Sequence, residues 1–440
     1  MSSSITPRRT AIVVSGFVLG AIALAGCSGS AGGAGSDGKV EISYLTTNGE
    51  DSIAVGNALI AAFEKANPDV TVTLNTRPGG TEGDNLVKTQ LSTGEMDDVF
   101  FYNTGSLFQA LNPDQALADL SDQAWVSNVT DNFATVVSTD GGTYGAPLGT
   151  SMAGGIAYNK KVFGDLGIDV PTDWSSLVDA AKKIKAAGIT PIEQTYGDSW
   201  TSQLFLLADL GNVYAQDPDW AEEFTANKAK FADEPALAGF THLQQAFDEG
   251  LFNEDFATAT AADGSAALAT GAAAMYPMLS SAVLTNIAQS NPDSVADIGF
   301  FAMPADEAAD TTLTVWEPSA VYIPRTVEGA KLEAAKEFVA FINSDEGCAI
   351  QNDNFVAGGP FSISSCSVPD DAAPMVAEIQ SYVTDGKSAP ALEFLSPVKG
   401  PNLENIAISV GSGISSAKDG AAAYDEDVKK QAQQLGLSGW

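Results

Sequence analysis

Hydrophobic and polar residues alternate in a way that predicts strands and helices in turn from residue 40 onward. Residues 40–44 alternate apolar and polar positions, as a half-buried strand does. Apolar residues between 55 and 66 then recur at helical spacing, and Asn67-Pro68 ends that pattern. Alternation returns over 70–74. A strand, a helix and another strand in this order predict an α/β fold with parallel strands.

The same two patterns continue to the end of the chain. They predict strands at 98–102 and 320–323 and helices at 107–111, 174–184, 332–342 and within the last 40 residues. Thr172 or Asp173 is the expected N-cap of the helix that begins at Trp174, and Gly188 is its expected stop. A chain of 440 residues with this content has room for two or three domains, each with its own core.

The first residues predict export and attachment to a membrane. Arg8 and Arg9 precede an apolar run at 11–25, which is shorter than the roughly 20 residues that span a bilayer. The run ends in Leu-Ala-Gly-Cys27 and resembles the lipobox of bacterial lipoproteins. This resemblance implies a signal peptide at 1–26, lipid on Cys27, and a protein anchored at the extracellular face of the cell membrane. The alternative is a secreted protein in which Cys27 is incidental.

Residues 27–39 are rich in glycine and serine and are predicted to be a flexible tether. Two further cysteines, Cys348 and Cys366, lie 18 residues apart. In an oxidising exterior this pair favours a disulfide, with a pair of buried free thiols as the alternative.

Charge and the shortage of histidine exclude several functions. With 21 basic and 56 acidic residues the formal charge is −35, which argues against nucleic-acid binding. The single histidine, His242, makes zinc chemistry or a Ser/His/Asp triad improbable, and its helical context predicts an exposed side chain. No G-x-S-x-G occurs, and the P-loop-like stretch at 385–388 lacks the glycine required at 381. We therefore expect no enzyme and no cofactor, although a paired-carboxylate glycoside hydrolase stays open.

Short motifs in a fixed order resemble the extracellular solute-binding proteins of ABC importers, in particular the sugar-binding group that includes maltose and multiple-sugar binding proteins. The matching stretches are Phe-Glu-Lys-Ala-Asn-Pro at 63–68, Asp-Val-Phe-Phe-Tyr at 98–102, Tyr-Gly-Ala-Pro at 144–147, Gly-Ile-Ala-Tyr-Asn-Lys at 155–160, Pro-Thr-Asp-Trp at 171–174, Gly-Ala-Ala-Ala-Met at 271–275 and the helix at 334–342 with Ser-Asp-Glu-Gly at 344–347.

The resemblance implies the type II periplasmic-binding-protein-like fold, in which two α/β lobes are joined by a hinge that the chain crosses three times. On that pattern lobe 1 holds 40–146 and 315–362, and lobe 2 holds 147–314 and 363–440. The crossings would fall near 147–149, 315–317 and 358–360. The implied partners are a sugar ligand and the membrane permease of the importer, with the binding protein itself a monomer.

The candidate ligand residues are rings and polar side chains expected at the carboxyl ends of strands or at the crossings, where open α/β sheets bind ligands. Sugars offer apolar C–H faces to aromatic rings and hydroxyls to carboxylates and amides. Tyr276 stands near the position where the family commonly has a tryptophan. The candidates are Asn48, Glu50, Glu82, Tyr102, Asn103, Ser151, Trp200, Tyr276, Trp316 and Glu317.

Three other interpretations remain open at this point. The same fold could bind a polyamine or an amino-acid-like solute, which a cleft lined by carboxylates with few rings would favour. A secreted glycoside hydrolase and a structural surface lipoprotein are the others. For every candidate residue, ordinary packing or a solvated loop is the alternative.

Overall fold

The structure is a computed structural model that describes residues 39–370 and 372–440. The predicted signal peptide at 1–26, the predicted lipidation site Cys27 and all of the predicted tether except Lys39 lie outside the described residues. None of the described helices is long and apolar enough to cross a membrane.

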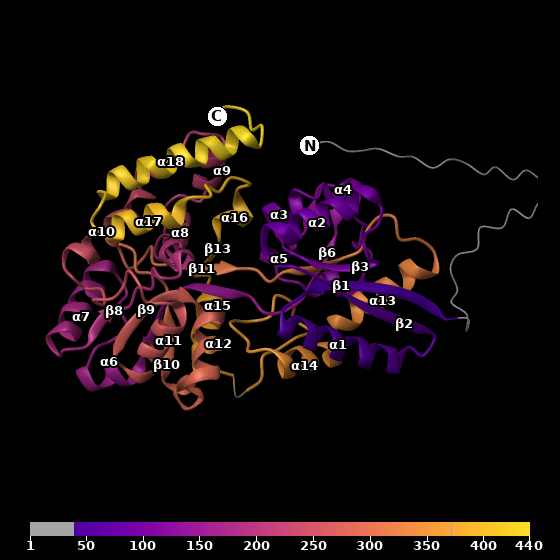
Figure 1. The fold of residues 1–440 in the computed structure, drawn as a ribbon, viewed down its shortest axis with the longest axis horizontal. Coiled ribbons are helices and arrows are strands. Elements are labelled where there is room, and N and C mark those ends of the chain that lie inside the picture. Colours follow the sequence, from indigo (N-terminus) through magenta and orange to yellow (C-terminus); the bar gives the residue numbers. More distant parts are fainter. Residues whose placement is uncertain (1–38, 371) are drawn as a thin grey trace, which may run out of the picture.

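The described chain forms two α/β lobes that lie side by side and are joined by a few extended segments (Figure 1). The predicted α/β class and the two-lobed arrangement are confirmed. The first segment of the chain forms the indigo lobe, and α13 (Ala330–Ile342) and α14 (Asp345–Asn354), in orange, return to it (Figure 1). The rest of the chain, including the C-terminal helices, forms the other lobe.

Lobe 1 is built on a five-stranded sheet in the order β2-β1-β3-β12-β6. The strands are β1 (Val40–Thr47), β2 (Val70–Arg77), β3 (Val99–Tyr102), β12 (Ala320–Tyr322) and β6 (Gly145–Pro147). β1 pairs in parallel with both β2 and β3, as the β-α-β pattern at 40–74 predicts. The antiparallel β12 lies between β3 and β6.

Helices cover both faces of this sheet. α1 (Glu50–Ala66), α13 and α14 pack over one core cluster, in which Phe63 and Phe338 meet edge to face. The other cluster contains Val87, Phe108 and Phe133. They come from α2 (Gly80–Thr93), α3 (Ser106–Gln109) and α5 (Asp131–Val136). The remaining elements are α4 (Pro113–Ala116), η1 (Ala124–Asn128), β4 (Ser138–Thr139) and β5 (Gly142–Thr143).

Lobe 2 has a six-stranded mixed sheet in the order β13-β11-β7-β9-β8, with β10 also paired to β7. Its strands are β7 (Met152–Asn159), β8 (Thr190–Ile192), β9 (Ala273–Leu279), β10 (Ile298–Phe301), β11 (Leu313–Trp316) and β13 (Ser388–Pro390). Its helices are α6 (Lys160–Leu166), α7 (Trp174–Ala186), η2 (Ser199–Gln203), α8 (Leu204–Gln216), α9 (Trp220–Thr225), α10 (Leu237–Asp248), α11 (Ala261–Thr270), α12 (Ser280–Ser290), η3 (Pro292–Asp297), α15 (Pro374–Thr384), α16 (Leu392–Leu395), α17 (Leu403–Gly411) and α18 (Ala417–Gln434).

The lone histidine is a core residue, so the expectation of an exposed side chain is wrong. His242 lies on α10 and is only 3% exposed. Its ring stacks on the indole of Trp174 with a centroid distance of 4.1 Å, and its Nε2 lies 3.0 Å from Asp306 Oδ1. The helical pattern identified the element correctly, but it did not reveal that the indole covers this face of α10.

Three segments join the lobes. The chain passes from Pro147 of β6 to Met152 of β7, and from Trp316 of β11 to Ala320 of β12. Ile363 and Cys366, which the sequence assigns to lobe 2, pack in a core cluster of lobe 1 instead. Their apolar side chains complete that core, so we put the third crossing after Cys366.

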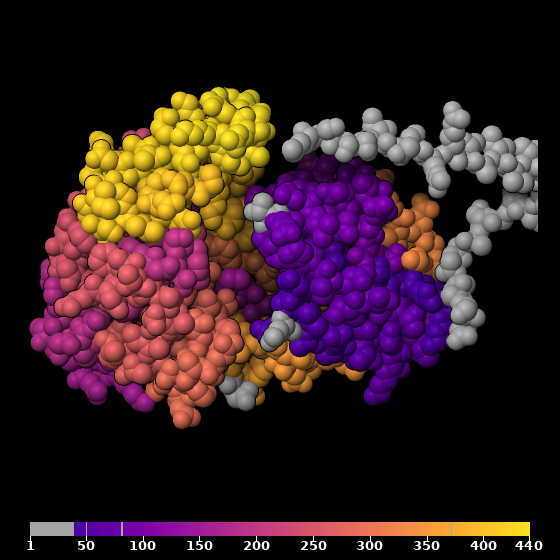
Figure 2. All heavy atoms as spheres, viewed as in Figure 1, coloured from indigo at the N-terminus to yellow at the C-terminus, as the bar shows by residue number. Residues whose placement is uncertain are grey.

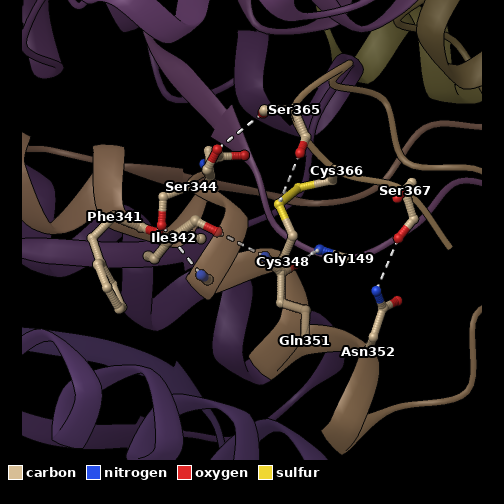
Figure 3. Close-up of a disulfide and its surroundings, with 12 residues drawn as sticks. Gly149, Phe341, Ile342, Ser344, Cys348, Gln351, Asn352, Ser365, Cys366 and Ser367 are labelled. Atoms are coloured by element: carbon tan, nitrogen blue, oxygen red, sulfur yellow. Dashed lines mark hydrogen bonds between the residues drawn. A yellow bond between two sulfur atoms is a disulfide. The ribbon is translucent and has the colours of Figure 1, made fainter. Parts of the chain in front are cut away.

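A disulfide ties α14 to the chain just before the third crossing, and a buried amide ties it to the first crossing (Figure 3). The sulfurs of Cys348 and Cys366 are bonded, with the Cα atoms 5.3 Å apart. One turn further along α14, Gln351 is 1% exposed; its Nε2 donates to the Ile342 carbonyl, and its Oε1 accepts from the Gly149 backbone N–H at 2.8 Å. The first crossing is thereby attached to the helix that the disulfide fixes.

Candidate functional site

The edges of the two sheets that face each other are both rich in strand ends. In lobe 1, β1, β2 and β3 run in parallel and end at the edge nearest lobe 2. In lobe 2, β7 begins at the first crossing. Both β9 and β11 run antiparallel to β7. β8 runs parallel to β9, and β13 runs parallel to β11. These four strands therefore all end at the edge of the sheet nearest lobe 1. Ligands of open α/β sheets gather at such edges.

A cavity of about 510 Å³ lies between the lobes at these edges. Figure 2 shows the hollow that separates the indigo lobe from the rest of the molecule. Lobe 1 contributes Lys88 and Asn103 to the lining, and the crossings contribute Met152, Trp316 and Glu317. Lobe 2 contributes Glu393, Phe394 and Lys399 from α16 and the loop that follows it. This volume is in the range of small-molecule sites.

The indole of Trp316 is fixed in this cavity by two neighbours. Its Nε1 donates a hydrogen bond of 2.7 Å to Glu393 Oε1. A Cβ atom added at Gly154 of β7 would collide with the indole ring, so only glycine lets the ring lie this close to the strand. Because Trp316 ends β11 and is paired with Met152 of β7, the ring stands where the lobe-2 sheet meets the crossing.

Two carboxylates line the same cavity as this ring. Glu317 is 8% exposed, and Ser362 Oγ donates to its Oε2 at 2.6 Å. Burial raises the pKa of Glu317 and favours its neutral form, and the Ser362 hydrogen bond opposes this only in part. Glu393 gives one oxygen to Trp316, while its Oε2 is buried without a hydrogen-bond partner in the described part of the chain.

Lysines line both sides of the cavity. Lys88 is exposed on α2, and Lys399 is half-buried in the loop after α16. Neither ammonium group forms an ion pair with a described residue. Within residues 39–370 and 372–440, no three His, Cys, Asp or Glu side chains are grouped so that they could hold a metal ion.

Three of the predicted ligand residues come together at this cavity: Asn103 from lobe 1, and Trp316 and Glu317 from the second crossing. Ser151 is 3% exposed and donates its hydroxyl to the Pro360 carbonyl, so it holds the first crossing to residue 360. Trp200, on η2, is 38% exposed and is not among the residues that line the cavity.

The other predicted residues lie elsewhere. Asn48 is exposed after β1, Glu50 begins α1, and Glu82 is exposed in the first turn of α2. The rings of Tyr102 and Tyr276 are packed in the cores of lobe 1 and lobe 2 and lie outside the cavity lining. Tyr276 uses its hydroxyl in a 2.7 Å hydrogen bond with Thr195, and we carry neither tyrosine into the proposed site.

A smaller cavity of about 140 Å³ lies at the start of α1. Thr46, Asp51, Phe101, Gly149 and Phe355 are among the residues that line it. It therefore adjoins the loop of Asn48 and the first crossing, and it extends the hollowed edge of lobe 1 beyond the larger cavity.

Sequence reasoning missed Glu393 and Lys399. Both follow β13, which is only three residues long and contains Pro390. A strand this short shows no alternation, so nothing in the sequence marked a strand end at which ligand residues are expected. Lys88 was missed because it lies within α2 and follows no strand.

Relatives of known function show which group of proteins the chain resembles. It is 26% identical over 350 residues to the multiple sugar-binding protein of Streptococcus mutans, a match that covers 78% of this chain and 80% of the relative. It is 23% identical over 339 residues to the melibiose/raffinose/stachyose-binding protein of Bacillus subtilis, covering 73% and 74%.

Solved structures share the fold. A putative binding protein of Bacillus subtilis in an open conformation matches with a TM-score of 0.76 at 18% identity, covering 91% of this chain and all of that one. A raffinose complex of the binding protein RafE matches with a TM-score of 0.71 at 21% identity, covering 90% and 100%. The type II fold expected from the sequence is thereby confirmed.

A family model described as bacterial extracellular solute-binding protein matches residues 48–347, which include the first two crossings. The match extends over more than half of the chain. This protein therefore belongs to the family of bacterial extracellular solute-binding proteins.

Proposed function

We propose that this protein captures a sugar or oligosaccharide between its two lobes and delivers it to the permease of an ABC importer. The observation that carries the proposal is the fixed indole of Trp316 in a cavity of about 510 Å³, which Glu317 and Glu393 also line. An indole face suits the C–H face of a sugar ring, and carboxylates suit its hydroxyls.

The relatives support the same ligand class. Multiple sugars, melibiose, raffinose and stachyose appear in the names of the two relatives above, and a similar protein of Bacillus licheniformis was solved with stachyose at 16% identity and a TM-score of 0.67. Members of this family bind solutes and do not catalyse reactions, which agrees with the expectation that the chain is not an enzyme.

The cavity's own charges argue against a polyamine. Lys88 and Lys399 would repel a cationic ligand, and a Glu317 whose pKa is raised by burial offers it less negative charge, which leaves Glu393 as the one carboxylate of the described lining to attract it. An uncharged polyol meets neither cost. Sugar is thus the better fit to the same set of side chains.

A ligand bound between the two lobes changes how the lobes are arranged, and this change can tell the permease that the protein is loaded. A ligand that touches both sheet edges favours the closed arrangement by its extra affinity for that state, and the permease can then distinguish loaded from empty protein. Trp200, exposed on the loop that follows β8, is a candidate second ring for sugars longer than the cavity.

The setting of the protein is part of the proposal. The N-terminal pattern supports a lipid on Cys27 at the extracellular face of the membrane, and the oxidising exterior supports a formed Cys348–Cys366 disulfide. We also propose that the protein works as a monomer. Replacing Cys27 with serine should move the protein from the membrane fraction to the medium; retention in the membrane would contradict the anchor.

Isothermal titration calorimetry on the mature protein tests the ligand class. The panel holds glucose, maltose, melibiose, raffinose and stachyose, with spermidine and glutamate as the non-sugar arms. We expect saturable one-to-one binding of at least one sugar and no binding of spermidine. Binding of spermidine alone, or of nothing in the panel, would overturn the sugar assignment.

A further inference from the structure

Only one of the two carboxylate oxygens of Glu393 forms a hydrogen bond with a described residue. Oε1 accepts the indole N–H of Trp316 at 2.7 Å, whereas Oε2 is buried and has no partner among the described residues. A buried carboxylate oxygen without a donor is costly, and such atoms in native structures usually have a function or a missing partner. The unused oxygen therefore needs an explanation.

The position of Glu393 joins three parts of the molecule. It lies on α16 directly after β13, which is the neighbour of β11 and hence of Trp316 in the lobe-2 sheet. The next residue, Phe394, packs so closely on Gly105 of lobe 1 that a Cβ there would collide with its ring. The Glu393 carboxylate thus lies where the Trp316 indole, the cavity and the contact between the two lobes meet.

The protein itself offers no obvious donor for the second oxygen. Lys399 lines the same cavity, yet it forms no ion pair with Glu393 in the structure. Rotation about the last bond of a glutamate side chain is soft, so the carboxylate can turn its free oxygen toward a ligand without losing its place beside Trp316. A hydroxyl group of a ring stacked on the indole would be within reach.

We propose that Glu393 determines which sugars the cavity accepts, holding the indole of Trp316 with one oxygen and accepting a ligand hydroxyl with the other. The inference rests on the sugar binding proposed above. An ionised carboxylate only accepts hydrogen bonds, so it favours a ring with a free hydroxyl at the edge next to the indole N–H. It disfavours a ring that is deoxygenated or O-methylated there, because the oxygen would then stay buried and unpaired.

The test compares Glu393→Gln with a matched control. Glutamine keeps a carbonyl oxygen for Trp316 and replaces the second acceptor by an N–H₂ donor. Glu404→Gln is the control, because Glu404 accepts from Ser199 and is not among the residues that line the cavity. Calorimetry is run with the sugar that the wild type binds and with its monodeoxy and mono-O-methyl analogues.

For the wild type we expect one hydroxyl whose removal weakens binding about 10- to 100-fold, the range for a hydrogen bond to a charged group. Glu393→Gln should weaken binding of the parent sugar by a similar factor and abolish the discrimination at that hydroxyl alone. A role confined to holding Trp316 would lower all affinities together. Glu404→Gln should match the wild type.

Distinct results overturn the inference and the proposed function. A Glu393→Gln protein that keeps both its affinity and its discrimination overturns the inference while sugar binding stands. If that variant does not fold, as judged by thermal melting, a wild type that is indifferent to the removal of every hydroxyl overturns it instead. A wild type that binds no sugar overturns the proposed function and the inference with it.

Discussion

The two walls of the cavity differ in how firmly their side chains are held. On the side of lobe 2 and the second crossing, Trp316 donates a hydrogen bond to Glu393, and Glu317 accepts a hydrogen bond from Ser362. On the side of lobe 1, Asn103 and Lys88 are exposed side chains. A pre-organised wall loses little entropy on binding, whereas exposed side chains are ordered only when the ligand arrives. The difference suggests that a ligand first meets lobe 2 and that lobe 1 then closes on it.

The lobes also differ in how they are stabilised. Lobe 1 has two core clusters and the disulfide that fixes α14 and, through Gln351, the first crossing (Figure 3). Lobe 2 relies on one large cluster that runs from β7 to the C-terminal helix. Lobe 1 thus combines the looser cavity wall with the covalently braced core.

Removing the Trp316 ring should have the largest effect on sugar affinity. Trp316→Ala deletes the ring on which the sugar would stack and removes the donor that holds Glu393 Oε1, so we expect a loss of about 4 kcal/mol in binding free energy, or roughly 1,000-fold. Calorimetry with the wild-type sugar measures it. Tyr214→Ala, which changes an exposed ring on α8, is the control and should bind normally. A Trp316→Ala affinity within a few-fold of wild type would show that the pre-organised wall is not the binding wall.

Removing the Cys348–Cys366 disulfide should lower the stability of the fold and leave sugar affinity largely unchanged. Replacing both Cys348 and Cys366 by serine opens a loop of 18 residues and should lower the free energy of unfolding by roughly 3 kcal/mol. Urea unfolding followed by circular dichroism measures the change, and reduction of the wild type should reproduce it. Unchanged stability would mean that the core of lobe 1 does not depend on the disulfide.

A buried acid makes the stability of lobe 2 depend on pH. Glu193, directly after β8, is 5% exposed, and burial, with Asp255 and Asp263 nearby, raises its pKa to about 8. The folded protein therefore holds the proton more tightly than the unfolded chain, and stability falls as the pH rises from about 4.5 toward 8. Glu193→Gln mimics the protonated form and should be more stable than wild type by up to about 4 kcal/mol at pH 8, with little difference at pH 4.5.

Thermal melting of both proteins across this pH range provides the measurement. Glu317 and Asp209 also have raised pKa values because of burial, so the wild type alone would show a fall of the same sign. Only the difference between wild type and Glu193→Gln isolates one group. A difference that does not grow with pH would contradict the assignment.

A change on the lobe-1 side of the cavity should have the smallest effect on sugar affinity. Asn103→Ala removes a side chain that is ordered only on closure, so we expect a loss of about 1 kcal/mol, or roughly five-fold in affinity. The same calorimetric titration applies. A loss as large as that of Trp316→Ala would mean that the two walls are equally organised.

The sequence predicted the fold well where patterns are long. The β-α-β unit at 40–74, the helix that Asp173 caps and the helix at 332–342 all have clear periodicity, and the structure has β1, α1, β2, α7 and α13 there. The lobe boundary at 363 was less certain because apolar residues such as Ile363 fit either core. Only tertiary packing decides between them.

The site was predicted in part for a physical reason. Strand ends and crossings drew attention to Asn103, Trp316 and Glu317, and the structure brings these three together in the lining of the cavity. Tyr102 also ends a strand, but its ring turns into the core of lobe 1, and side-chain direction at a strand end is not encoded in a short pattern. Glu393 follows a strand too short to be recognised, and its role depends on a neighbour 77 residues away in sequence.

A crystal structure of the protein with its sugar tests the central claim most directly. We expect a sugar ring in van der Waals contact with the face of the Trp316 indole, in the cavity between the lobes, with a hydroxyl on Glu393. A sugar bound elsewhere, with the Trp316 ring uncovered, would contradict the assignment of this cavity as the ligand site.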